Sequence, residues 1–247
     1  MAIKVIELEL TRPFPSLQYI DANRYAKVQI LVRKNNQPIG YAFIELVGET
    51  NKHLLEEKYL RSEIECQIPC QSVKTLDLAS LEYNWPTLTV VICTRGRPQS
   101  LKNALESLTK LIYPADKIEL LVVDNAPNDD SVTKIVAQFP GYRQVVEPRP
   151  GLNWARNNAL KIAKGEIVAY VDDDVRVDPL WAKGIAYHFS DPQVGCVTGL
   201  VAPAELETDA QQMFEEYGGF GKGFEPHEYS LELPRRWDYS KSPRHGR

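Results

Sequence analysis

From about residue 86 onward, short apolar runs alternate with segments whose apolar residues recur at helical spacing. The runs predict buried strands at 88–93, 118–123, 144–146, 167–171 and 194–201. The helical spacing predicts helices at 98–111, 130–139, 151–164 and 179–189. Strands that alternate with helices indicate a parallel sheet with helical crossovers, and so an α/β domain.

The N-terminal third follows a different pattern, in which strands dominate. Strands are predicted at 1–10, 26–33 and 41–47, and one amphipathic helix at 51–63. The turn residues Asn35 to Pro38 separate the last two strands, as expected for a hairpin. We therefore expect a small β-rich module over residues 1–82, the α/β domain over 86–226, and an irregular, basic, disordered tail over 227–247.

The composition is that of an ordinary soluble protein and excludes some classes of function. Of 247 residues, 43% are hydrophobic and 25% charged, and the net charge of −4 does not suggest nucleic acid as a partner. No apolar run is long enough to cross a bilayer and the N-terminus does not resemble a signal peptide, so a cytoplasmic location is the default expectation. The basic tail would support only a weak peripheral membrane contact.

The cysteines do not predict a metal site. Cys66 and Cys70 are four positions apart, but no second pair of Cys or His completes a zinc site, and two free thiols are expected. Cys93 and Cys196 lie in apolar runs and are expected in the core.

Three consecutive aspartates, Asp172, Asp173 and Asp174, directly follow the apolar run 167–171. Ligands of open α/β sheets bind at the carboxyl ends of the strands, where these carboxylates would lie. Three adjacent carboxylates repel one another unless a cation neutralises them or hydrogen-bond donors bind them. Sites made of oxygen ligands favour Mg²⁺ or Mn²⁺. A helix N-cap is the alternative, although one Asp would suffice for it.

Polar residues also follow the other predicted strands of the α/β domain. Thr94, Arg95 and Arg97 follow the first strand, Asp124 and Asn125 the second, and Arg156 lies in the helix after the third. Arginines and a metal ion suit a diphosphate, and an acidic residue at a strand end can bind a base or ribose. Asp124 as a turn former, and Arg156 and Arg97 as surface charges, are the competing interpretations.

With these motifs in view, the sequence resembles the family 2 glycosyltransferases of the GT-A fold over about residues 86–226. The resemblance rests on four segments in the family's order: 89–98, 121–126, 150–157 and the triplet 172–174, which resembles the family's metal-binding Asp-x-Asp. It implies a nucleotide-diphospho-sugar donor (UDP-, GDP- or dTDP-linked), a divalent ion, and inverting transfer to an acceptor of unknown class (glycan, lipid or small molecule).

The resemblance also implies roles for individual residues. Asp172 and Asp174 would hold Mn²⁺ or Mg²⁺ on the diphosphate, with Asp173 beside the donor. The base and ribose would be bound by Asp124, Asn125 and Arg156, and the nucleotide pocket would be lined by Thr94 and Arg95.

The sequence departs from the family in its last part. Such enzymes continue to an acceptor-binding segment in which a Glu-Asp pair supplies the base, and no Glu-Asp dipeptide occurs here. Three explanations remain open: a fragment, a truncated protein that binds donor without efficient transfer, or a substitute base among Asp178, Glu205 and Glu207. The catalytic base is therefore unassigned.

Two other functions compete. A haloacid-dehalogenase-type phosphotransferase also places Asp-x-Asp after a strand, but it requires Thr or Val where this chain has Arg176. A non-catalytic nucleotide-sugar-binding or scaffold protein, with the N-terminal module as a docking surface, is the non-enzymatic alternative.

Overall fold

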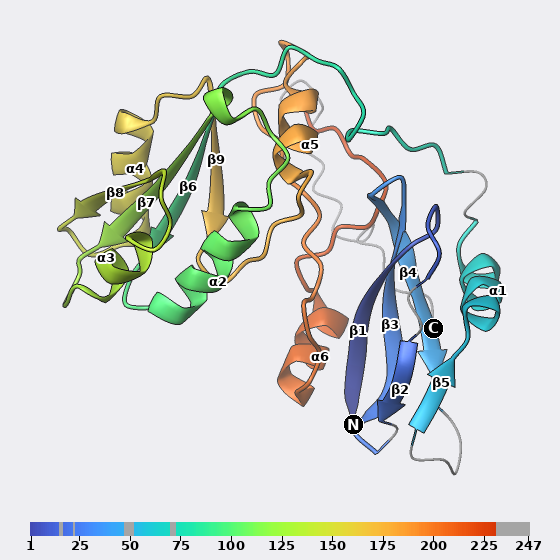
Figure 1. Cartoon of the computed structure of the whole chain (residues 1–247). Helices are drawn as coiled ribbons and strands as arrows, with labels where there is room; N and C mark the ends of the chain where they lie inside the picture. The colour runs from blue at the N-terminus through green and yellow to red at the C-terminus, as the bar shows by residue number, and fades with distance from the viewer. Residues whose placement is uncertain (15–16, 22, 47–51, 70–72, 231–247) are drawn as a thin grey trace.

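The computed structural model describes residues 1–14, 17–21, 23–46, 52–69 and 73–230 (Figure 1). Most of the predicted tail, and Cys70, lie outside this part of the chain; residues 227–230 have no regular structure. Across the described ranges, no helix is both long and apolar enough to span a bilayer.

The α/β domain is built on a four-stranded parallel sheet. Its strands lie in the order β8 (Tyr142–Glu147), β7 (Ile118–Asn125), β6 (Leu88–Thr94) and β9 (Ile167–Asp172). All three pairings are parallel, so the four carboxyl ends lie at one edge of the sheet (Figure 1). The predicted α/β class with a parallel, Rossmann-like sheet is confirmed.

Helices cover both faces of this sheet. One face carries α2 (Pro98–Leu108), α3 (Ser131–Val136) and α5 (Trp181–His188), which share its larger core cluster. The opposite face carries α4 (Leu152–Ile162), whose Ala155 and Ala159 are fully buried against the strands. Leu101 and Leu105 of α2 are also fully buried, and truncating such a leucine to alanine costs about 2–5 kcal/mol.

A close approach at Gly165 fixes how β9 enters the sheet. A Cβ at this position would lie 2.4 Å from the backbone nitrogen of Thr89. The Thr89 hydroxyl accepts from the Gly165 amide at 2.8 Å and donates to Glu119 at 2.8 Å. Only glycine permits this contact, which sets the register of the strand that ends in the aspartates.

The N-terminal module contains a second, three-stranded sheet. Its order is β1 (Ala2–Glu9), β3 (Tyr25–Lys34) and β4 (Gln37–Glu45). The predicted hairpin of β3 and β4 is confirmed, with Asn35 and Asn36 in the left-handed region at φ 52° and 62°. Helix α1 (Glu57–Gln67) packs Leu60 and Ile64 against one face of the sheet.

Two predicted elements are wrong, and one α-helix was not predicted. The expected helix at 51–63 begins only at Glu57, because β5 (Lys52–Leu55) pairs instead with β2 (Leu17–Asp21). The expected strand at 194–201 is irregular and, within the described residues, pairs with no other strand; Gly195 and Gly199 weaken its strand preference. Cys196 in this segment is exposed and not in the core.

The unpredicted element is α6 (Asp209–Tyr217), which a capping box at Thr208 and Gln211 begins. This helix lies beside β1 of the N-terminal sheet (Figure 1), and Gln212 donates to the carbonyl of Met1. The predicted domain boundaries at 82, 86 and 226 stay a prediction.

Candidate functional site

The three aspartates after β9 point in different directions. Asp172 and Asp174 are solvent-exposed, with 64% and 61% of their side chains accessible, whereas Asp173 is buried. None of them caps a helix in the described chain: the turn before α5 is capped by Asp178, which accepts from the Leu180 amide at 2.8 Å. The competing N-cap interpretation therefore fails.

Asp173 is tied into the sheet by its neighbour at the end of β6. Its Oδ2 accepts the hydroxyl of Thr94 at 2.6 Å, and both side chains are buried. The Thr94 hydroxyl is thus engaged with Asp173 rather than exposed to a ligand. This contact joins the ends of β6 and β9 and leaves Asp172 and Asp174 as the accessible carboxylates.

Two arginines neutralise the aspartates. Arg97 lies with its NH1 3.3 Å from Asp173 and 3.4 Å from Asp174, and Arg156 of α4 lies 3.1 Å from Asp172. Arg97 is exposed, as expected for a surface charge, and it lies beside two of the aspartates. Arg95 is exposed, and it forms no ion pair with any residue that the structure describes.

Asp124, at the end of β7, is the most unusual group at this edge. It pairs in register with Thr94, the residue is 1% exposed, and its buried Oδ1 has no hydrogen-bond partner among the residues that the structure describes. Burial raises the pKa of this carboxyl, and the negative charge of Asp129 adds to the effect. A turn former would use its side-chain oxygen to accept a nearby amide, and this one does not.

Asn125 has both ends of its side chain engaged by the loop that follows β8. Its Nδ2 donates to the carbonyl of Arg149 at 2.7 Å, and its Oδ1 accepts from the Gly151 amide at 2.8 Å. These contacts hold the loop 147–151 beside Asp124, and the predicted contact of Asn125 with a nucleotide stays a prediction.

A further cluster at this edge was not predicted. The carboxylate of Glu147 is buried and accepts from Arg149 at 2.7 Å and 3.0 Å, and this pairing lowers the pKa of Glu147 to about 2. The Arg149 guanidinium lies over the Trp154 ring at 4.0 Å. The sequence did carry a signal, because Glu147 and Arg149 flank Pro148 just ahead of the resembling segment 150–157.

The carboxylates fit a divalent ion that is shared with a substrate. Among the residues that the structure describes, no three His, Cys, Asp or Glu side chains converge on one point. Mg²⁺ in phosphate-transfer sites is commonly held by one or two carboxylates together with substrate phosphates and waters. Asp172 and Asp174 are the exposed carboxylates of the triplet and supply such a set.

The three suggested substitute bases are occupied. Asp178 lies 2.6 Å from the Arg33 guanidinium, and Glu207 accepts from Arg24 and from the Tyr25 hydroxyl. These donors lower the pKa of Glu207. Glu205 accepts a hydrogen bond from the side-chain Nε2 of Gln211 at 3.0 Å. The structure assigns the role of base to none of them.

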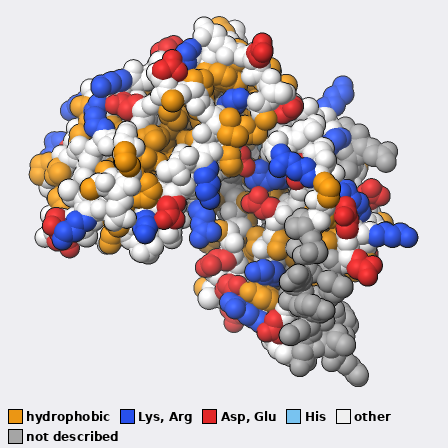
Figure 2. Space-filling view, in the orientation of Figure 1, with side chains coloured by type: hydrophobic (Ala, Val, Ile, Leu, Met, Phe, Trp, Pro, Cys, Tyr) orange, Lys and Arg blue, Asp and Glu red, His pale blue; other side chains and the backbone are white. Residues whose placement is uncertain are grey.

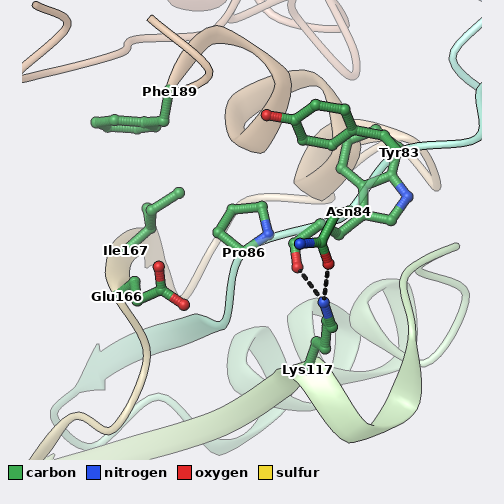
Figure 3. A pocket seen from close by; sticks show the side chains of 8 residues that line it. Tyr83, Asn84, Pro86, Lys117, Glu166, Ile167 and Phe189 are labelled. Carbon is green, nitrogen blue, oxygen red and sulfur yellow. Dashed lines mark hydrogen bonds between the residues drawn. The ribbon is translucent and has the colours of Figure 1, made fainter. Parts of the chain in front are cut away.

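A cavity of about 410 Å³ lies at the opposite edge of the same sheet (Figure 3). Pro86, Lys117 and Ile167, which line it, stand at the amino ends of β6, β7 and β9. Lys117 donates to the Asn84 side chain, which lies beside it in Figure 3, and to the Trp85 carbonyl. This cavity is separate from the aspartates, and its lysine is already satisfied.

The amino-acid pattern that defines the family described as "Glycosyl transferase family 2" matches residues 89–246. An uncharacterized protein of Mycobacterium tuberculosis is 30% identical over 54% of this chain and 41% of its own length. A glucosyl-dolichyl phosphate glucuronosyltransferase of Haloferax volcanii is 24% identical over 53% of this chain and 43% of its own.

Among solved structures, the mannosyltransferase PcManGT of Pyrobaculum calidifontis, in complex with GDP-Man and Mn²⁺, is similar with a TM-score of 0.43 and 27% identity. That similarity covers 49% of this chain and 40% of the mannosyltransferase. The chain spans less than half the length of the curated relatives named above.

Proposed function

The chain belongs to glycosyl transferase family 2, and on that premise we propose that it binds a nucleotide-diphospho-sugar at the carboxyl edge of β6, β7 and β9. The family pattern covers 89–246, which includes every residue of that edge. The proposed reaction is transfer of the sugar to an acceptor hydroxyl, with Mn²⁺ or Mg²⁺ on the diphosphate.

The observation that carries the proposal is the unpaired Oδ1 of Asp124. A buried acceptor without a partner costs about 1–3 kcal/mol, and folded proteins rarely contain one. A ligand N–H placed against Asp124 would satisfy it. Uracil, thymine and guanine each have a ring N–H on their pairing edge, so UDP, dTDP and GDP donors suit this carboxylate and a base without a ring N–H suits it less.

The diphosphate would lie on the β9 side of the edge. Arg95 is free to bind it, and the arginines on the aspartates, Arg97 and Arg156, stand beside the place where phosphate oxygens would approach. Arginine binds such oxygens through two parallel hydrogen bonds. Asp172 and Asp174 would hold the divalent ion, which stabilises the negative charge of the departing nucleoside diphosphate.

The reaction is written as a single displacement. The acceptor oxygen forms a bond to the anomeric carbon while the bond from that carbon to the diphosphate oxygen breaks, so the configuration at the carbon inverts. The acceptor hydroxyl gives up its proton to bulk water, and the nucleoside diphosphate leaves with the bonding electrons. In this scheme the chain's arginines bind and orient the diphosphate, and Asp124 orients the base.

The experiment is a thermal-shift titration with UDP-, GDP- and dTDP-glucose, each with and without Mn²⁺. A ligand at 100 times its dissociation constant stabilises a protein by about 2.7 kcal/mol, which corresponds to a shift of several degrees. We expect a shift that requires Mn²⁺ and is specific for one nucleotide. Absence of a shift with all three donors would contradict the proposal.

Sugar transfer separates the enzyme from the non-catalytic alternative. The catalytic base is unassigned, so both alternatives enter the test. Release of UDP or GDP from the bound donor, measured with and without added acceptor sugars, distinguishes the two: turnover establishes the transferase, and binding without turnover establishes the donor-binding protein.

A further inference from the structure

We propose that the N-terminal sheet positions the aspartate turn, with Arg33 acting as a positioning residue through Asp178. The sequence carries no chemical motif in this module, and the only role considered for it above was that of a docking surface. The proposal rests on the proposed function, because the turn that it positions is the one that would hold the metal ion and the diphosphate.

The contact between the two parts of the chain is an ion pair with little freedom. Arg33 of β3 is 14% exposed in its side chain, and its NH1 lies 2.6 Å from Asp178 Oδ2. The same guanidinium donates to the carbonyl of Asn36 at 3.0 Å and pairs with Glu7 of β1 at 3.1 Å. Two partners besides Asp178, one on β1 and one in the β3–β4 turn, hold the guanidinium in place.

Asp178 transmits this constraint to the aspartates because the connection is short. Only residues 175–177 separate it from Asp174. Its other oxygen, Oδ1, caps the turn that leads into α5 through the Leu180 amide. The connection is also tied at its middle, where the Val177 amide donates to the Ser107 hydroxyl of α2 at 3.1 Å. The Val175 amide closes the aspartate turn itself on the Asp172 carbonyl at 3.3 Å.

The N-terminal sheet also contacts the chain beyond α5, at residues 206 and 207. The Ile3 amide donates to the Leu206 carbonyl at 2.9 Å along the outer edge of β1, and Glu207 accepts from Arg24 at 2.8 Å. Further on, Phe224 packs edge-on against Tyr41 of β4 at 5.0 Å. The sheet is thus engaged by the transferase part at several points, and it is a poor candidate for the independent docking surface considered above.

The two lobes that these contacts join are visible in the space-filling view, where the surface is indented between them (Figure 2). Holding the aspartate turn in one conformation lowers the ordering cost when a metal ion and a diphosphate bind. Loss of the Arg33–Asp178 pair should therefore loosen the turn before it affects the global fold.

Hydrogen exchange on the unliganded protein tests the constraint directly. Asp178→Asn preserves the size of the side chain and its cap on Leu180 but removes the ion pair. We expect the Val175 and Val177 amides to exchange on the order of tenfold faster than in the parent. The matched control is Glu207→Gln, which breaks the Arg24–Glu207 ion pair and should leave the exchange rates of the Val175 and Val177 amides unchanged.

Binding tests the consequence. In calorimetric titrations of UDP or GDP with Mn²⁺, Asp178→Asn should weaken binding on the order of tenfold, and Glu207→Gln should not. Should Asp178→Asn fail to fold, Arg33→Lys replaces it, because lysine keeps the charge but cannot bridge all three partners.

Unchanged exchange at Val175 and Val177 would overturn the positioning role, as would faster exchange without weaker binding. A parent protein that binds no nucleotide would refute the proposed function instead. In that case the exchange experiment still decides whether Arg33 and Asp178 hold the aspartate turn.

Discussion

Replacing Asp124 with asparagine should stabilise the free protein and weaken donor binding at the same time. The change keeps the shape of the side chain and removes its charge. In the unliganded protein the carboxylate is buried with an unpaired Oδ1, and burial raises its pKa above the ordinary 3.8. A buried carboxylate that destabilises the fold and lies at a strand end is expected where a ligand supplies the missing hydrogen bond.

The magnitudes follow from that geometry. A neutral amide removes the cost of burying the carboxylate charge, although its oxygen stays unpaired, and the net gain should be about 1 kcal/mol. For a chain of this length, 1 kcal/mol raises Tm by about 2–4 °C. Donor binding should weaken about tenfold, because a hydrogen bond from the base to a charged acceptor becomes one to a neutral acceptor.

The sign of the pH dependence is fixed by the direction of the pKa shift. A carboxyl with a raised pKa destabilises the fold once the pH exceeds its ordinary pKa, so the gain in Tm should grow as the pH rises above 3.8 and should vanish below it. Calorimetric unfolding of the parent, Asp124→Asn and the exposed control Asp116→Asn measures it. A variant that is less stable than the parent at pH 7, or that binds donor equally well, would refute the reasoning.

Other substitutions at this edge have separate expected outcomes. Asp174→Asn should abolish Mn²⁺-dependent donor binding in titrations while changing the free energy of unfolding by less than about 0.5 kcal/mol, because the side chain is exposed. Asn125→Ala should cost about 1–3 kcal/mol in denaturant unfolding, since the Arg149 carbonyl and the Gly151 amide both lose their partner. Because the pKa of Glu147 is lowered from 4.5 to about 2, its ionised form stabilises the fold above about pH 4.5, and this contribution is lost as the pH falls toward 2. Unfolding curves at pH 5 and pH 3 should therefore show a smaller loss of stability for Glu147→Gln than for the parent.

The sequence predicted most of the α/β domain because its strands and helices differ in period. The apolar runs became β6 to β9, and Pro98 begins its helix where its missing amide does no harm. The prediction failed at 52–55, where pairing with β2 outweighed the helical spacing. It also failed at 194–201, where the apolar run pairs with no strand of the described chain. Helix α6 was predictable in principle, because Thr208 and Gln211 form a capping box.

For the site, the sequence predicted which residues gather at the edge but not which way each side chain points. The register that places Thr94 beside Asp124 follows from strand ends alone. That Thr94 binds Asp173, and that Asn125 holds a loop, depends on rotamers and on loop paths between strands, which have no periodic signal. Contacts between distant parts of the chain, such as Arg33 with Asp178, are not visible in local spacing either.

The most direct measurement for the central claim is a crystal structure of the protein soaked with Mn²⁺ and the nucleoside diphosphate selected by thermal shift. The account predicts an anomalous manganese peak beside Asp174 or Asp172, bridged to the diphosphate, with a ring N–H of the base within hydrogen-bond distance of Asp124. A nucleotide bound elsewhere, for example in the cavity beside Lys117, or a base that leaves Asp124 unpaired, would contradict it.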